Sequence, residues 1–84
     1  MNINEKTYIQ FQQIVLSYPQ ADADLILAEN FMEFIELLEP YASEGEDMNK
    51  LTMYMVRQDP TIYEVFMSCI LNLGLRANGV DSCY

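Results

Sequence analysis

Residues 22 to 41 carry apolar and acidic side chains at a spacing that fits an α-helix. At about 100° per residue, the acidic side chains gather on one side, four of them within an arc of about 60° and the fifth just outside it. These residues are Asp22, Glu29, Glu33, Glu36 and Glu39. The opposite side is apolar and contains Leu27, Ala28, Phe31, Met32, Phe34, Ile35 and Leu38. The pattern predicts one amphipathic helix, capped by Asp22 and ending between Leu38 and Tyr41.

A helix is also predicted before this stretch. It extends from Asn4, a favourable capping residue, to Tyr18, which precedes a proline. Its apolar residues recur at the spacing of one helical stripe: Tyr8, Phe11, Ile14, Val15 and Tyr18. The other side of this helix is polar and contains Lys6, Gln10, Gln13 and Ser17.

A third helix is predicted to begin near Ser43 and to end near Gln58. Ser43 and Glu46 have the spacing of a capping box, although Gly45 could instead end the preceding helix. Residues 51 to 56 (LTMYMV) also suit a strand, which is the alternative to a helix there.

The clearest boundary in the chain is the Asp59–Pro60 pair. Asp59 is a favourable cap, and a proline at the first helical position loses no hydrogen bond. The fourth helix should continue to about Ala77, where Asn78 and Gly79 favour a left-handed stop. Connections this short favour antiparallel neighbours. We therefore expect an all-α, single-domain bundle of about four short helices over residues 1–79, followed by a tail at 80–84.

The charge of the chain restricts its partners. Thirteen acidic residues against four basic ones give a formal net charge of −9. Phosphate backbones and anionic lipid surfaces are bound through basic residues, so neither nucleic acid nor membrane is an expected partner. A protein with a basic surface is the natural one. The N-terminal residues do not resemble a secretory signal, and the longest apolar stretch, at 62–75, is too short to span a bilayer. We expect a soluble, cytoplasmic protein.

Residues that usually perform catalysis are scarce. Histidine, the commonest general base near neutral pH, does not occur. The three glycines are scattered, which excludes a phosphate-binding loop. Cys69 and Cys83 lack metal or redox spacing, and Cys69 falls on a core-facing helical position. Residues 22 to 33 resemble a calcium loop in part, but Leu27 stands where glycine must turn the chain. We expect neither an enzyme nor a cofactor or metal site.

Two surfaces remain as candidates for binding. The acidic face of residues 22 to 41 contains no lysine or arginine to relieve its own repulsion, so it serves either solubility or recognition. The second candidate is apolar, because the last two helices have apolar residues on more than one side, which indicates either core packing or an interface. Its residues are Met53, Tyr54, Met67, Leu71 and Leu75.

The main functional hypothesis is a non-catalytic module that binds, sequesters or inhibits a basic partner protein. Inhibitors of nucleic-acid-binding proteins made by phages and mobile elements belong to this class. Full mimicry of DNA would need charges from several helices, such as Glu44, Glu46, Asp47 and Asp59, because one helix carries fewer charges per unit length than DNA. The alternative is a helical assembly factor or chaperone that forms a homodimer through the apolar Met/Tyr/Leu surface.

Overall fold

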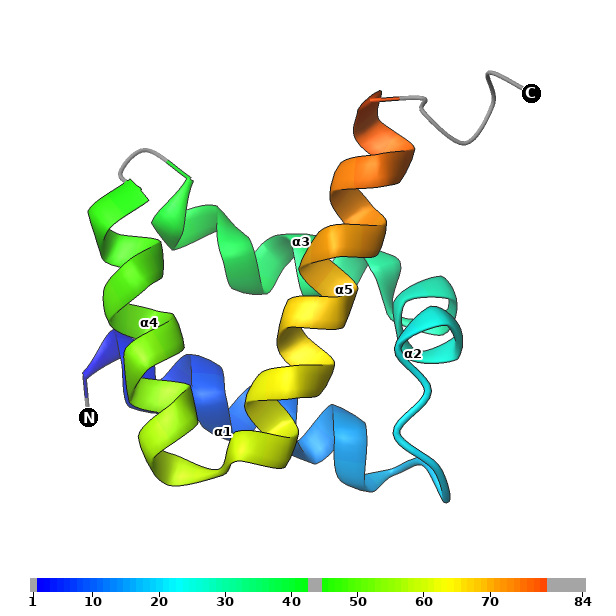
Figure 1. Ribbon diagram of the computed structural model, residues 1–84, viewed down its shortest axis with the longest axis horizontal. Coiled ribbons are helices and arrows are strands. Elements are labelled where there is room, and N and C mark those ends of the chain that lie inside the picture. Colours follow the sequence, from blue (N-terminus) through cyan, green and yellow to red (C-terminus); the bar gives the residue numbers. More distant parts are fainter. Residues whose placement is uncertain (1, 43–44, 79–84) are drawn as a thin grey trace.

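The computed structural model describes residues 2–42 and 45–78, with side chains described up to residue 74 (Figure 1). These residues form five α-helices and one 3-10 turn, and no strand occurs among them. The elements are α1 (Ile3–Leu16), α2 (Ala23–Glu29), α3 (Phe31–Leu38), η1 (Glu39–Tyr41), α4 (Gly45–Gln58) and α5 (Pro60–Asn78). The prediction of a compact all-α fold is confirmed, with five helices in place of about four. Residues 51 to 56, which also suited a strand, are helical.

Three phenylalanines form the centre of the core. Phe11 of α1, Phe34 of α3 and Phe66 of α5 have ring centroids 5.2 to 5.9 Å apart, and their planes are steeply inclined to one another. Edge-to-face contacts of this kind add to the stabilisation that burial alone supplies. The other buried apolar residues surround this triangle: Tyr8, Val15, Ile26, Leu27, Tyr41, Leu51, Met55, Ile62, Val65 and Cys69. Every described helix therefore contributes to one core.

The helix caps agree with the sequence at two places. The Asp22 carboxylate accepts hydrogen bonds from the backbone N–H groups of Asp24 and Leu25, at 3.0 and 3.3 Å. The Asp59 carboxylate accepts one from the backbone N–H of Thr61 at 2.9 Å, and Pro60 is the first residue of α5, as predicted. The predicted Ser43 cap, the Gly79 stop and the 80–84 tail lie outside the described residues.

The predicted limits of the first helix were wrong by two residues at each end. Asn2, not Asn4, caps α1, and its side chain accepts a hydrogen bond from the backbone N–H of Glu5 at 2.8 Å. Asn4 lies inside the helix and accepts a hydrogen bond from the Tyr41 hydroxyl at 2.9 Å. At the other end, Tyr18 N–H bonds to the Val15 carbonyl three residues back, which tightens the chain into a turn after Leu16.

The single long helix predicted for residues 22 to 41 is wrong, because the chain bends at Asn30. This residue ends α2 and begins α3, with φ −124° and ψ 30°, outside the helical range. Its side-chain amide donates to the Ile26 carbonyl at 2.9 Å and to the Tyr18 hydroxyl at 2.8 Å. Asparagine competes for backbone hydrogen bonds in this way, which explains why the helix is interrupted here.

The bend changes which side of the 22–41 segment is buried. Phe34 is buried as predicted, but Phe31 and Met32, which the straight helix placed on the buried side, are 40% and 66% exposed. Ala28 is also exposed. The axis of α3 differs from that of α2, as Figure 1 shows, so the two helices cannot present one common face to the core. None of the helices in the described ranges is long and apolar enough to cross a membrane.

Candidate functional site

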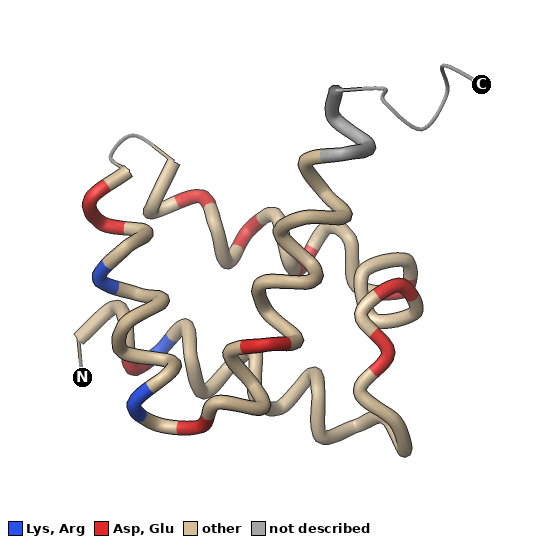
Figure 2. The backbone as a smooth tube through the Cα atoms, in the orientation of Figure 1, with Lys and Arg blue, Asp and Glu red and all other residues tan. Residues whose placement is uncertain are grey.

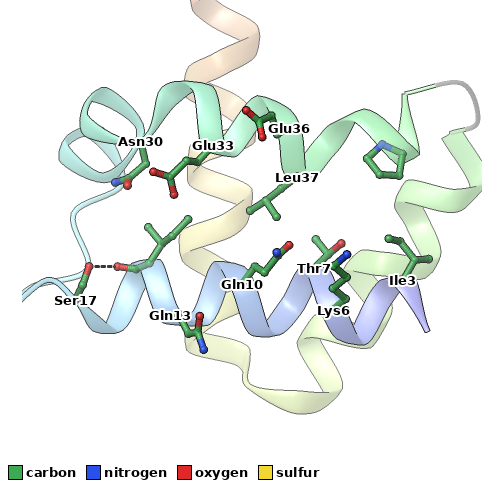
Figure 3. Close-up of a pocket in the computed structure, with 12 residues that line it drawn as sticks. Ile3, Lys6, Thr7, Gln10, Gln13, Ser17, Asn30, Glu33, Glu36 and Leu37 are labelled. Carbon is green, nitrogen blue, oxygen red and sulfur yellow. Dashed lines mark hydrogen bonds between the residues drawn. The ribbon is translucent and has the colours of Figure 1, made fainter. Parts of the chain in front are cut away.

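A groove of about 710 Å³ lies between α1 and α3 (Figure 3). Twelve residues line it: Ile3, Lys6, Thr7, Gln10, Gln13, Ile14, Ser17, Asn30, Glu33, Glu36, Leu37 and Pro40. The groove follows α1 for most of its length, from Ile3 at one end to Ser17 at the other. Its size falls within the range that small ligands and peptide segments occupy in proteins.

The two walls of the groove differ in charge. Lys6, Gln10 and Gln13 of α1 form one wall, and Glu33 and Glu36 of α3 form the other (Figure 3). All five of these side chains are exposed. One wall is thus acidic, and the other is amide-rich with a single ammonium group.

Between these walls the lining is less polar. Thr7 is only 2% exposed, and Ile14 and Leu37 are half-buried and pack against the core. The Tyr41 and Thr7 hydroxyl groups are hydrogen-bonded at 3.2 Å, so the buried hydroxyl of Thr7 has a partner. Burial of Tyr41 itself raises the pKa of its hydroxyl above the ordinary value. A ligand in the groove would therefore meet fixed apolar and hydroxyl groups below and mobile polar side chains at either side.

The two ends of the groove also differ. Asn30 lines one end, beside the bend, where the Tyr18 hydroxyl donates to Glu29 Oε1 at 2.7 Å. This hydrogen bond is the main reason that the pKa of Tyr18 is raised. At the opposite end, Ile3 and Pro40 also line a second hollow of about 220 Å³, which contains Lys50 and Asp47 of α4. Basic residues lie on α1 and α4 in Figure 2, whereas α2 and α3 carry only acidic ones.

The five acidic residues predicted as a binding face are all exposed, but they do not share one helix. Asp22 caps the start of α2, and Glu29 is hydrogen-bonded to Tyr18 beside the bend. Glu39 lies in η1. The groove brings together only Glu33 and Glu36, because they follow the bend and lie one turn apart on α3.

The residues of the predicted apolar surface have different environments. Met53 and Leu71 are 54% and 65% exposed. Tyr54 packs edge-on against Tyr8, with ring centroids 5.9 Å apart, and Met67 packs against the core. The side chain of Leu75 lies outside the described residues.

Sequence reasoning missed two features of the surface. It placed Lys6, Gln10 and Gln13 on the polar side of the first helix but assigned them no role, because nothing indicated which segment would lie opposite. It also did not predict that Phe31 and Met32 would be exposed. The one available signal was Asn30, a weak helix former in the middle of an apolar run.

Cys69 is fully buried, as predicted, and its sulfur lies 3.8 Å from the Ala23 carbonyl oxygen. Burial raises the pKa of this thiol to about 11, so the reactive thiolate is disfavoured. Cys83 lies outside the described residues. Within the described part of the chain, no three acidic or cysteine side chains come together as a metal site.

Comparison of the chain with protein-family models, curated proteins and solved structures gave no match. Function is therefore inferred from the groove and its charges.

Proposed function

We propose that this chain is a non-catalytic, acidic module that binds a basic partner protein and so sequesters or inhibits it. The observation that supports the proposal is the position of Glu33 and Glu36, two exposed carboxylates on one wall of a groove. A carboxylate on a convex surface is surrounded by water. In a groove, a partner's side chain can approach from one side while the groove lining displaces water from the other, which strengthens the attraction.

Arginine and lysine are the side chains that would satisfy these carboxylates. Glu33 and Glu36 are one helical turn apart, and a guanidinium group can donate several hydrogen bonds to carboxylates at once. The net charge of −9 adds a long-range attraction that speeds the encounter with a basic surface. Net charge would thus set the rate of encounter, and the groove would set where the partner binds.

The groove favours recognition of particular basic side chains over imitation of a whole nucleic acid. Glu33 and Glu36 are separated by about 4.5 Å along the helix axis. DNA presents a phosphate charge about every 1.7 Å of its axis. A nucleic-acid-binding protein, of the kind that phage and mobile-element inhibitors act on, is still a suitable partner, provided that a basic segment of it enters the groove.

Charge reversal inside and outside the groove tests the proposal. The Glu33→Lys/Glu36→Lys variant and a control, Glu46→Lys/Glu64→Lys, both change the net charge from −9 to −5, since each substitution adds two charges. Glu46 and Glu64 are exposed and do not line the groove. Tagged wild type and both variants would be used to capture proteins from extracts of the organism that encodes the chain, with quantitative mass spectrometry.

A partner with a basic surface should be captured by the wild type and the control and lost with the groove variant. Raising the salt concentration to about 0.5 M should weaken the capture, because exposed charges are then screened. Equal capture by the groove variant, or capture that is unaffected by salt, would show that the acidic wall is not the binding surface.

Self-association is a second candidate function, and a different observation favours it. Met32 and Leu71 are 66% and 65% exposed, and Leu25 and Phe31 are also exposed large apolar residues. Such residues on a small protein are available for a dimer or for an apolar client. The molecular mass in solution, measured by light scattering for wild type and for Leu71→Asp, tests the dimer. A monomeric mass for the wild type at high concentration would exclude it.

A further inference from the structure

We infer that the α1–α3 groove binds an extended peptide segment carrying charges of both signs, with a basic side chain beside Glu33 and Glu36 and a carboxylate near Lys6. This inference rests on the proposed function and makes it more specific, because a basic partner in general need not contain an acidic residue at a fixed distance. The length of the groove, the free amide group of Gln10 and the order of the charges along the groove support it.

The dimensions of the groove suit an extended segment. From Lys6 to Ser17 the axis of α1 rises about 16 Å. An extended chain advances about 3.3 Å per residue, so five or six residues would cover this length. The lining from Lys6 to Ser17 therefore has the length of a short extended segment.

The amide groups in the α1 wall suit a peptide backbone. Gln10 and Gln13 lie one turn apart among the lining residues, and Figure 3 shows Gln10 pointing toward α3 and Gln13 pointing away from it. Each side-chain amide offers donors and an acceptor, as does each peptide unit of an extended chain. Neither takes part in a side-chain hydrogen bond with another described residue, whereas the neighbouring Gln12 donates to the Tyr8 hydroxyl. The Gln10 amide is therefore free to bond a peptide in the groove without breaking an existing contact.

The order of charges along the groove sets the order of charges in the ligand. Glu33 and Glu36 lie toward the Asn30 end, and Lys6 lies toward the Ile3 end (Figure 3). Lys50 lines the adjoining hollow, so two ammonium groups lie near this end, with Asp47 as the opposing charge there. A second basic residue of the ligand would approach Lys6 and be repelled, while an acidic residue would be attracted.

The order of charges along the groove predicts a preference between peptides that is opposite to the preference expected from net charge alone. A protein of net charge −9 should attract a peptide with two arginines more strongly than one with an arginine and a glutamate. The groove reverses the preference, because Lys6 attracts the glutamate and repels the second arginine. Replacing a repulsive charge pair at Lys6 by an attractive one should change the affinity by about three- to tenfold, as for other exposed ion pairs.

The test uses two labelled peptides, Arg-Ala-Ser-Thr-Ala-Glu and Arg-Ala-Ser-Thr-Ala-Arg, both with blocked ends. Fluorescence polarisation would give their affinities for the full-length chain and for two variants, Lys6→Glu and Arg57→Glu. Both variants change the net charge equally, and Arg57 is exposed on α4 and lines neither hollow. Circular dichroism would verify that each variant is folded.

We expect the mixed-charge peptide to bind the wild type and Arg57→Glu about three- to tenfold more tightly than the dibasic one, and Lys6→Glu to reverse the order. Tighter binding of the dibasic peptide to the wild type would overturn the inference, as would equal effects of the two variants or no binding of either peptide at millimolar concentration. The proposed function would survive the first two results if Glu33→Lys/Glu36→Lys still weakened binding of the dibasic peptide more than its control did.

Discussion

The bend at Asn30 can be tested by making the same substitution at two positions of α3 that lie one turn apart. Phe34→Leu removes a ring from the buried aromatic triangle, and Phe31→Leu removes one that is 40% exposed. Both residues lie on the side that a straight amphipathic helix over residues 22 to 41 would bury. The straight helix therefore predicts two similar losses of stability, whereas the bent one predicts a large loss only at Phe34.

The size of the loss at Phe34 follows from its two contacts. Its ring centroid lies 5.9 Å from that of Phe11 and 5.7 Å from that of Phe66. Each aromatic pair contributes about 0.5–1.5 kcal/mol beyond burial, so losing both reduces the free energy of unfolding by about 1–3 kcal/mol. At Phe31, a partly exposed position outside the triangle, the change should be below about 0.5 kcal/mol.

Urea and thermal unfolding followed by far-ultraviolet circular dichroism would measure both changes. A chain of 84 residues has a total stability of about 4–13 kcal/mol, so Phe34→Leu should still fold. A loss of about 2 kcal/mol would lower the Tm by about 8–16 °C. Equal losses at Phe31 and Phe34, measured with unchanged urea dependence, would refute the bent arrangement.

Three further predictions concern single side chains. Asp59→Ala should lower stability by about 1 kcal/mol, because it removes the cap of α5, and Asp59→Asn should restore most of that loss in thermal melts. In a Cys83→Ser background, the buried Cys69 thiol should not react with a thiol reagent at about pH 8 until urea unfolds the chain. The raised pKa of Tyr41 stabilises the fold below about pH 10, and this contribution is lost as the pH rises through the folded-state pKa. The urea midpoint should therefore fall more steeply above pH 10 in the wild type than in Tyr41→Phe.

Features that depend on neighbours in sequence could be predicted. The Asp22 and Asp59 caps need only the backbone N–H groups two or three residues away, and both occur as expected. Buried positions in α1, and Cys69 in α5, also follow from helical spacing within each segment. Tyr8, Phe11 and Val15 are buried in α1, as the apolar stripe predicted.

The bend could not be predicted, because it depends on a contact between segments. The Asn30 amide donates to the Tyr18 hydroxyl, and Tyr18 belongs to the turn after α1. A helical projection gives each residue a direction around one straight axis and contains no information about a partner twelve positions away. A second error followed from the first, since Phe31 and Met32 were assigned to the buried side of an axis that does not exist.

The same bend produces the candidate site. On a straight helix, Glu29, Glu33 and Glu36 would form one convex row facing solvent, and binding would depend on the row as a whole. With the bend, Glu29 is bonded to Tyr18 beside the junction, while Glu33 and Glu36 line the α3 wall of the groove, nearer to Asn30 than Lys6 is. The surface predicted from the sequence was a row of like charges on one helix. The structure instead places two carboxylates on one wall of a groove and an ammonium group farther along the other wall. We propose that this order of charges lets the groove distinguish ligands by the order of their charges as well as by their net charge.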